Sequence, residues 1–176
     1  GRALPMIRSS PNCGVSWLQW DRGDREMVTT AEIQPRAPTP EGEWRPKVVA
    51  FLCNWCSYTG ADLAGISRIQ WDPSVHIIRV MCSGRMDPTF VAKAFEFGAD
   101  GVIISGCHPG ECHYQEGNYK ALRRVHLMRR LLDGFGIDPR RMRLVWISAS
   151  EGDRWAETAN EGARDIRSLG PMRAGA

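Results

Sequence analysis

Apolar and polar residues are arranged in two different ways along the chain, and the change occurs near residue 46. Beyond this point, short and nearly continuous apolar runs alternate with longer stretches in which apolar residues recur every three or four positions. The short runs are typical of strands buried on both faces of a parallel sheet, and the longer stretches are typical of amphipathic helices. The pattern predicts strands at residues 47–52, 76–81, 101–105 and 143–147.

Three of the predicted helices can be placed from their capping residues and apolar faces. Asp87 and Pro88 form an N-cap followed by proline at the first helical position, and Gly98 ends that helix. A later helix is expected to start near Ser150, with Asp153 in the capping-box position. Between them lies a helix with an apolar face of Leu122, Val125, Met128, Leu132 and Phe135 and a solvated face that carries Arg123, Arg124, Arg129 and Arg130.

The alternation of strands and helices predicts an α/β fold over residues 47–171. Right-handed crossovers then give a doubly wound, mainly parallel four-stranded sheet with helices on both faces. Residues 1–46 hold six of the eleven prolines and no sustained period, so we expect an irregular N-terminal arm without its own core. Residues 172–176 form a tail. The arm carries four large apolar residues that are costly to leave in water, and we expect them to pack on its own domain or on a partner subunit. They are Trp17, Leu18, Trp20 and Trp44.

Five of the six cysteines directly follow predicted strands. The carboxyl ends of parallel strands meet at one edge of a sheet, where open α/β sheets gather their ligand sites, so we expect these thiols to converge. Cysteines that served only as small apolar residues would be scattered through strands and helices. The five are Cys53 and Cys56 after the first strand, Cys82 after the second, and Cys107 and Cys112 after the third.

Composition narrows the class of protein. The 23 Lys and Arg against 20 Asp and Glu leave a net charge of +3, and no run of four basic residues occurs, so we expect no nucleic-acid partner. No apolar stretch approaches the roughly 20 residues that span a bilayer, and no secretory signal pattern begins the chain. We therefore expect a cytoplasmic protein with reduced thiols. Cys13, which has no second cysteine nearby, is interpreted as incidental.

Several thiols that converge in a reducing compartment bind a metal or exchange electrons. Four cysteine thiolates commonly hold an iron-sulfur cluster, and loops rich in glycine and serine supply backbone N–H groups to the sulfurs. A structural zinc site is one alternative, although zinc ribbons usually pair two Cys-x-x-Cys motifs, and Cys82 stands alone here. A thioredoxin-like dithiol at Cys53 and Cys56 is another alternative, which leaves three cysteines unused. His108 and His113 do not have the spacing of a Rieske centre.

Four motif blocks, in order, carry a family resemblance. They are CNWCSYTGADLAG at 53–65, IRVMCSGRMDP at 78–88, GADGV through GCHPGECHY and GNY at 98–119, and WISASEG at 146–152. Together they resemble the delta subunit family of methyl-viologen-reducing (F420-non-reducing) hydrogenase, over about residues 47–171. The resemblance implies a non-catalytic electron-transfer subunit with a [2Fe-2S] cluster. It also implies that electrons pass between a hydrogenase or formate dehydrogenase module and a flavin-containing, iron-sulfur heterodisulfide reductase A-type subunit.

A [2Fe-2S] cluster, as the resemblance implies, has four cysteine ligands, so one of the five cysteines is spare. Cys56 is the weakest candidate because we expect it to point into the first turn of its helix. Arg85 and His108 are expected near the cluster, as groups that raise its potential or as ordinary loop residues. The segment after the fourth strand covers the cluster, contacts a partner or caps a helix, and it contains Ser148, Ser150, Glu151 and Gly152. The expected ligands are Cys53 or Cys56, together with Cys82, Cys107 and Cys112.

Overall fold

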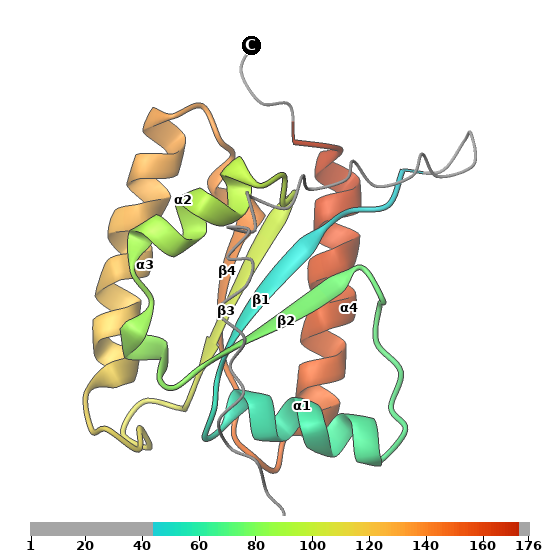
Figure 1. Cartoon of the computed structure of the whole chain (residues 1–176), viewed down its shortest axis with the longest axis vertical. Helices are drawn as coiled ribbons and strands as arrows, with labels where there is room; N and C mark the ends of the chain where they lie inside the picture. Colours follow the sequence, from blue (N-terminus) through green and yellow to red (C-terminus); the bar gives the residue numbers. More distant parts are fainter. Residues whose placement is uncertain (1–43, 173–176) are drawn as a thin grey trace, which may run out of the picture. The chain divides into compact units, whose positions relative to one another are not determined.

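In the part of the chain that the structure describes, four parallel strands form one sheet in the order β2-β1-β3-β4 (Figure 1). The computed structural model describes residues 44–172. The predicted arm up to residue 43, with Cys13, and the tail from residue 173 lie outside the described residues. The α/β class and the parallel sheet are confirmed. The strands are β1 (Val48–Cys53), β2 (Val75–Val80), β3 (Gly101–Gly106) and β4 (Met142–Trp146).

Helices cover both faces of the sheet, as the doubly wound order requires (Figure 1). The helices α1 and α4 pack on one face, and α2 and α3 pack on the other. Within residues 44–172, no helix combines the length and the apolarity needed to cross a bilayer. The helices are α1 (Ser57–Ile66), α2 (Pro88–Glu96), α3 (Gly117–Gly134) and α4 (Gly152–Leu169), with single 3-10 turns η1 (Ser83–Arg85) and η2 (Pro139–Arg141).

Alternation along β1 divides the core into two apolar layers. Ala50 and Leu52 face the layer built around Trp155 of α4, which is fully buried. Phe51 faces the opposite layer, where it packs with residues of α2 and α3 such as Val125. Successive side chains of a strand point to opposite faces, so one apolar run supplies both layers. Neither layer contains a cysteine.

The expected burial of every strand on both faces is wrong for β2. Ile78 is 45% exposed, and His76 and Arg79 are exposed as well. The reason is topological, because β2 is an edge strand that pairs only with β1. The inner strand β3, which pairs with β1 and β4, is buried along its whole length as expected.

The start of α4 differs from the prediction. The helix begins at Gly152, and neither Ser150 nor Asp153 caps it. Glu151 precedes the helix, and its carboxylate accepts a hydrogen bond from the backbone N–H of Ser148 at 2.7 Å. The acidic side chain therefore organises the turn before the helix and leaves the first helical N–H groups without a side-chain cap.

Phe135, which directly follows α3, and Arg124 within the helix depart from the expected face assignment. Phe135 is 70% exposed, whereas Ala121 occupies an inward position. Arg124 does not belong to a solvated face, because its guanidinium donates to the backbone carbonyls of Gly84 at 2.6 Å and Met86 at 2.9 Å. The helix is thus fastened to the 3-10 turn that follows Cys82.

The crossover connections reverse direction between β1 and β3, which makes the carboxyl ends of these two strands a topological switch point. The chain leaves β1 toward α1 on one face and leaves β3 toward α3 on the other. Open α/β sheets bind ligands at such a switch point. The loops that begin at Cys53 and Cys107 lie on either side of it.

Candidate metal centre

The structure brings the five predicted cysteines together at the carboxyl edge of the sheet. Two pairs of sulfur atoms lie close: Cys53 Sγ is 3.8 Å from Cys107 Sγ, and Cys82 Sγ is 3.8 Å from Cys112 Sγ. All four of these thiols are buried, and all five cysteines are free of disulfides. Each pair joins loops that follow different strands, so the sheet itself sets the spacing.

Cys56 also belongs to this group. The thiol of Cys107 acts on the pKa of Cys56 as a hydrogen-bond neighbour, and the expected direction of the Cys56 side chain, into the first turn of α1, stays a prediction. Burial raises the pKa of Cys56, and the hydrogen bond with Cys107 opposes that rise. Cys107 therefore has two sulfur neighbours from the first loop, Cys53 and Cys56, of which Cys53 is the more deeply buried.

Backbone N–H groups favour a thiolate at Cys112. Burial by itself would raise the pKa of this thiol, but N–H donors from Tyr114, Asn118 and Gly117 lower it below its ordinary value. Burial raises the pKa of its partner Cys82, although the N–H of Gly84 donates to that sulfur at 3.3 Å. Within this pair, the backbone donors therefore favour the thiolate more at Cys112 than at Cys82.

The other sulfur pair is set in a less polar surrounding. Burial is the main cause that raises the pKa of Cys107 strongly, and the neighbouring thiols of Cys56 and Cys53 add to the rise. Such a buried thiol ionises only when a positive charge compensates it. A bound metal ion supplies that charge and takes the thiolate as its ligand.

A glycine contact holds the Cys82–Cys112 pair. A Cβ atom at Gly117 would overlap Cys82 Sγ and lie 3.0 Å from Cys112 Sγ. A Cβ atom at Gly84 would lie 2.7 Å from the Cα of Gly117. The two backbones therefore pack against each other and against the sulfurs without room for a side chain. The first turn of α3 is thus the floor of the site.

Aromatic side chains bridge the two cysteine-bearing loops on the solvent side. Trp55 stacks on His113 with 4.0 Å between ring centroids and an interplanar angle of 18°. The indole N–H of Trp55 also donates to Tyr114 Oη at 3.3 Å. Trp55 lies between Cys53 and Cys56, and the other two rings directly follow Cys112. The bridge was not predicted from the sequence, although the positions of these rings beside cysteines are visible there.

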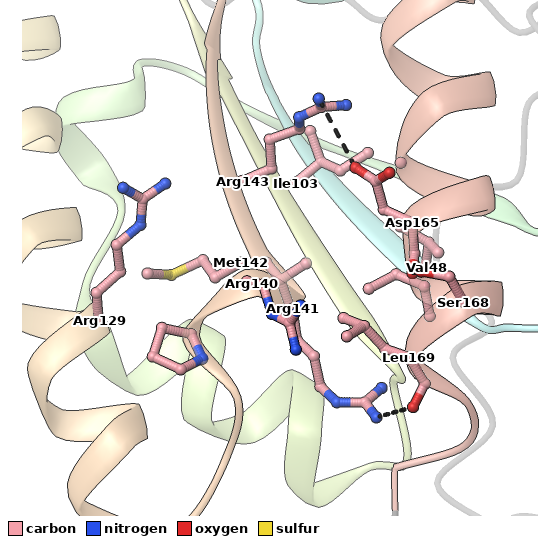
Figure 2. Close-up of a pocket in the computed structure, with 14 residues that line it drawn as sticks. Val48, Ile103, Arg129, Arg140, Arg141, Met142, Arg143, Asp165, Ser168 and Leu169 are labelled. Atoms are coloured by element: carbon pink, nitrogen blue, oxygen red, sulfur yellow. Dashed lines mark hydrogen bonds and ion pairs between the residues drawn. The ribbon is translucent and has the colours of Figure 1, made fainter.

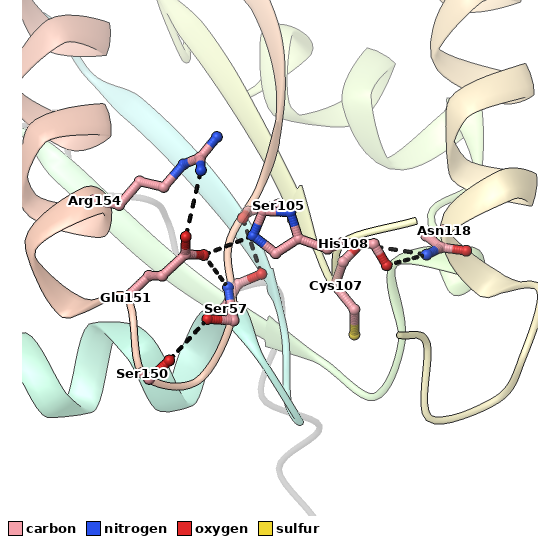
Figure 3. A network of polar contacts seen from close by, with 9 residues as sticks. Ser57, Ser105, Cys107, His108, Asn118, Ser150, Glu151 and Arg154 are labelled. Carbon is pink, nitrogen blue, oxygen red and sulfur yellow. Dashed lines mark hydrogen bonds and ion pairs between the residues drawn. The ribbon is translucent and has the colours of Figure 1, made fainter. Parts of the chain in front are cut away.

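A polar network fixes the loop after β3 from the opposite side (Figure 3). His108 Nε2 lies 2.7 Å from Glu151 Oε2, and Asn118 Nδ2 donates to the carbonyl of His108 at 2.7 Å. The Ser148 N–H and then His108 lower the pKa of Glu151 to about 2. His108 thus joins the β3 and β4 loops. The segment after β4 thus contacts the loop after β3, a role that was not predicted from the sequence.

The residues present fit a metal centre with two metal atoms. At a metal–sulfur distance of about 2.3 Å, two thiolates on one tetrahedral metal lie about 3.8 Å apart. Both sulfur pairs have this separation. In the part of the chain from residue 44 to 172, no three Cys, His, Asp or Glu side chains converge as ligands of one ion. Two separate thiol pairs, with N–H donors to the sulfurs, are what a binuclear iron-sulfur cluster requires.

Comparisons with known proteins agree with this chemistry. The family model described as methyl-viologen-reducing hydrogenase, delta subunit, matches residues 48–170. The chain is 55% identical over 128 residues to the D-type iron-sulfur subunit of the vhc F420-non-reducing hydrogenase of Methanococcus voltae, covering 73% of this chain and 89% of that protein. It is 53% identical over 131 residues to the corresponding iron-sulfur subunit of the F420-non-reducing hydrogenase of Archaeoglobus profundus, covering 74% and 96%.

A third relative is much longer than this chain. The A-type subunit of the ferredoxin/F(420)H(2)-dependent CoB-CoM heterodisulfide reductase of Methanosarcina acetivorans is 45% identical over 139 residues. This match covers 79% of the present chain but 18% of that protein. A segment similar to this chain therefore occurs within a larger reductase subunit.

Proposed function

The chain belongs to the family of the methyl-viologen-reducing hydrogenase delta subunit, and we propose that it is an electron-transfer subunit with one [2Fe-2S] cluster. The observation that carries the proposal is the arrangement of four buried thiols as two pairs, each with a sulfur separation of 3.8 Å. When bound, such a cluster takes up and releases one electron at a time. The protein's contribution is to hold the thiolates, donate N–H groups to them and exclude water.

Cys53 and Cys107 are the proposed ligands of one iron, and Cys82 and Cys112 are those of the other. Cys56 is the spare thiol, because it is less buried than Cys53 and shares Cys107 as its neighbour. At the Cys112 site, backbone donors already lower the pKa of the thiol, which favours the thiolate that a metal needs as its ligand. The Cys107 site needs the metal's charge to ionise its thiol.

The names of the relatives support a hydrogenase and an A-type heterodisulfide reductase subunit as partners, whereas the formate dehydrogenase and the flavin follow from the family resemblance alone. Two relatives are iron-sulfur subunits of a hydrogenase, and a segment like this chain lies within the A-type subunit of a heterodisulfide reductase. Two segments that are fused in one protein are commonly separate subunits that contact each other in a related complex. We therefore propose two redox partners in the cytoplasm. One is a hydrogenase or formate dehydrogenase module, and the other is a flavin-containing, iron-sulfur reductase subunit of the A type.

Metal analysis on anaerobically purified protein tests this function. We expect about two irons and two inorganic sulfides per chain, with visible absorption from sulfur-to-iron charge transfer. Stoichiometric zinc without visible absorption would instead support a structural site. A metal-free chain that reduces disulfides through Cys53 and Cys56 would support a thioredoxin-like protein. Either result would overturn the proposal.

Serine substitutions test the ligand set. Replacement of Cys53, Cys82, Cys107 or Cys112 by serine removes one ligand from a pair, and we expect the cluster content to fall by about tenfold or more, as for lost metal ligands and their supports. Cys56→Ser is the matched control, because it changes the same loop and should retain iron and the visible spectrum. If Cys56→Ser loses iron while Cys53→Ser keeps it, the two cysteines exchange roles and the assignment of the spare thiol is wrong.

A further inference from the structure

The four proposed ligands are not equally far from solvent. Cys53 and Cys107 are each 1% exposed, whereas Cys112 is 8% and Cys82 is 9% exposed. Electron tunnelling slows steeply with distance, so a partner's redox centre reaches the site best from its most accessible side. That side is the Cys82–Cys112 pair.

A groove opens directly beside this pair. Its volume is about 470 Å³, and its lining includes Met81, Cys82, Arg85, Tyr114, Gly117 and Lys120. The two large apolar residues at its rim are well exposed, with Met81 at 57% and Tyr114 at 49%. Exposed apolar surface next to a buried functional group marks an interaction site more often than it marks ordinary surface.

The charged residues of the groove are both cations. Arg85 lies over the ring of Phe90, 5.3 Å from its centroid, and has no ion pair with a carboxylate among the described residues. Lys120 pairs with Glu116 on the same helix at 3.6 Å, and both side chains are more than half exposed. An exposed pair of this kind is weak and exchanges readily for another carboxylate. The groove therefore favours negative charge.

We propose that the groove beside Cys82 is the surface where this chain exchanges electrons with a protein partner, and that the partner presents an apolar patch edged by acidic side chains. The inference rests on the proposed function, because it requires a cluster at Cys82 and Cys112. An apolar centre with complementary charges at the rim is the ordinary anatomy of a transient interface. The step itself moves one electron from donor to acceptor, and no bond, proton or group is transferred.

The opposite end of the molecule offers a matched control. A cavity of about 540 Å³ lies at the amino-terminal ends of the strands, and Arg129 is one of its lining residues (Figure 2). Arg129 and Arg164 are both exposed, and each lies twelve residues beyond the first residue of its helix, Gly117 or Gly152. Twelve residues of helix span about 18 Å. Charges at these positions are therefore remote from the groove.

The test uses the full, cluster-loaded chain and two inorganic oxidants of opposite charge. The reduced protein is mixed in a stopped-flow instrument with anionic cobalt(III)-EDTA or with cationic hexaammineruthenium(III), at about 0.1 M ionic strength, where charges are screened over about 10 Å. In R85E/K120E, we expect the ratio of the anionic to the cationic rate constant to fall about tenfold, because local charge steers the oxidant. A change in reduction potential moves both rates in the same direction, so it largely cancels in this ratio.

In the control R129E/R164E, we expect the same ratio to change by less than about twofold. An unchanged ratio in R85E/K120E, or an equal fall in both double variants, would overturn the inference. A second measurement needs no electron transfer, because it uses the anionic dysprosium(III)-EDTA complex as a magnetic probe. The complex should speed the magnetic relaxation of the reduced centre in wild type and in R129E/R164E. The increase in relaxation rate should be smaller in R85E/K120E. Equal relaxation in all three proteins would also overturn it. A chain without iron would overturn the proposed function instead, so the two failures are distinguishable.

Discussion

Gly117 is the residue at which the site tolerates the least change. A Cβ atom there would overlap Cys82 Sγ and crowd Cys112 Sγ. We therefore expect Gly117→Ala to reduce the iron content several-fold, since one sulfur pair must move apart while the rest of the fold is kept. Iron content and the visible spectrum per chain measure the loss.

Gly134→Ala is the control for this substitution. Gly134 is the last residue of the same helix, and a Cβ atom there meets nothing within 4 Å. A helical glycine replaced by alanine without strain typically stabilises a protein by about 0.4–1 kcal/mol. Full iron content in Gly117→Ala would show that the first turn of α3 does not form the floor of the site.

The sequence predicts part of this site and leaves the rest open. The convergence of Cys53, Cys82 and Cys107 follows from their places after parallel strands, which meet at one edge whatever the loops do. The contact of Gly117 with Cys82 joins residues 35 positions apart through the packing of α3 on η1. The contacts of Arg124 with η1 were missed in the same way. Helical spacing predicts on which face of a helix a residue lies, but it does not identify a distant hydrogen-bond partner.

At the scale of elements, the loop before β2 is fastened to α4 through Asp72. Its carboxylate accepts hydrogen bonds from the N–H and hydroxyl groups of Ser74 and from Arg167 Nη2. Burial alone would raise the pKa of Asp72, but these donors lower it below its ordinary value. A carboxyl with a lowered pKa stabilises the fold above its ordinary pKa, and this contribution is lost as pH falls through the lowered value.

We expect Asp72→Asn to lower the free energy of unfolding by about 1–2 kcal/mol at pH 7, as for a hydrogen-bonded charged group. The difference from wild type should shrink as the pH falls from about 4, the ordinary carboxyl pKa, through the lowered pKa of Asp72, below which both side chains are neutral. Urea unfolding at several pH values measures it. Asp62→Asn is the control, because Asp62 is exposed in the middle of α1 and forms no hydrogen bond or ion pair among the described residues. A difference that is constant between pH 7 and pH 2 would contradict the charge-based account.

The predicted elements agree best with the structure where a single local sequence pattern determines the element. All four strands were located to within about two residues, and the N-cap at Asp87 is confirmed by its hydrogen bond from the Thr89 N–H at 2.9 Å. The start of α4 was misplaced because Glu151 binds Ser148 and His108 before the helix begins. Local capping rules do not predict that a side chain before the helix forms a hydrogen bond with a residue of another loop.

At the scale of the whole molecule, the sheet and its two apolar layers are independent of the cysteines. Both layers consist mainly of residues from the strands and helices, and neither includes a thiol. We therefore expect the iron-free chain to keep most of its far-ultraviolet circular dichroism. Iron loading should raise its melting temperature, because a ligand that binds only the folded state stabilises that state. Complete loss of secondary structure on iron removal would show that the metal, not the core, maintains the fold.

One binuclear cluster bridging the two thiol pairs has a distinct magnetic signature, which quantitative electron paramagnetic resonance of the reduced protein measures. Two coupled ferric ions have no net spin, and one added electron leaves one unpaired spin. We therefore expect a silent oxidised protein and, after reduction, one spin per two irons and per chain, lost in Cys82→Ser. A protein that contains stoichiometric zinc and gives no signal after reduction would contradict the binuclear cluster. A protein with one spin for every four irons would contradict it as well.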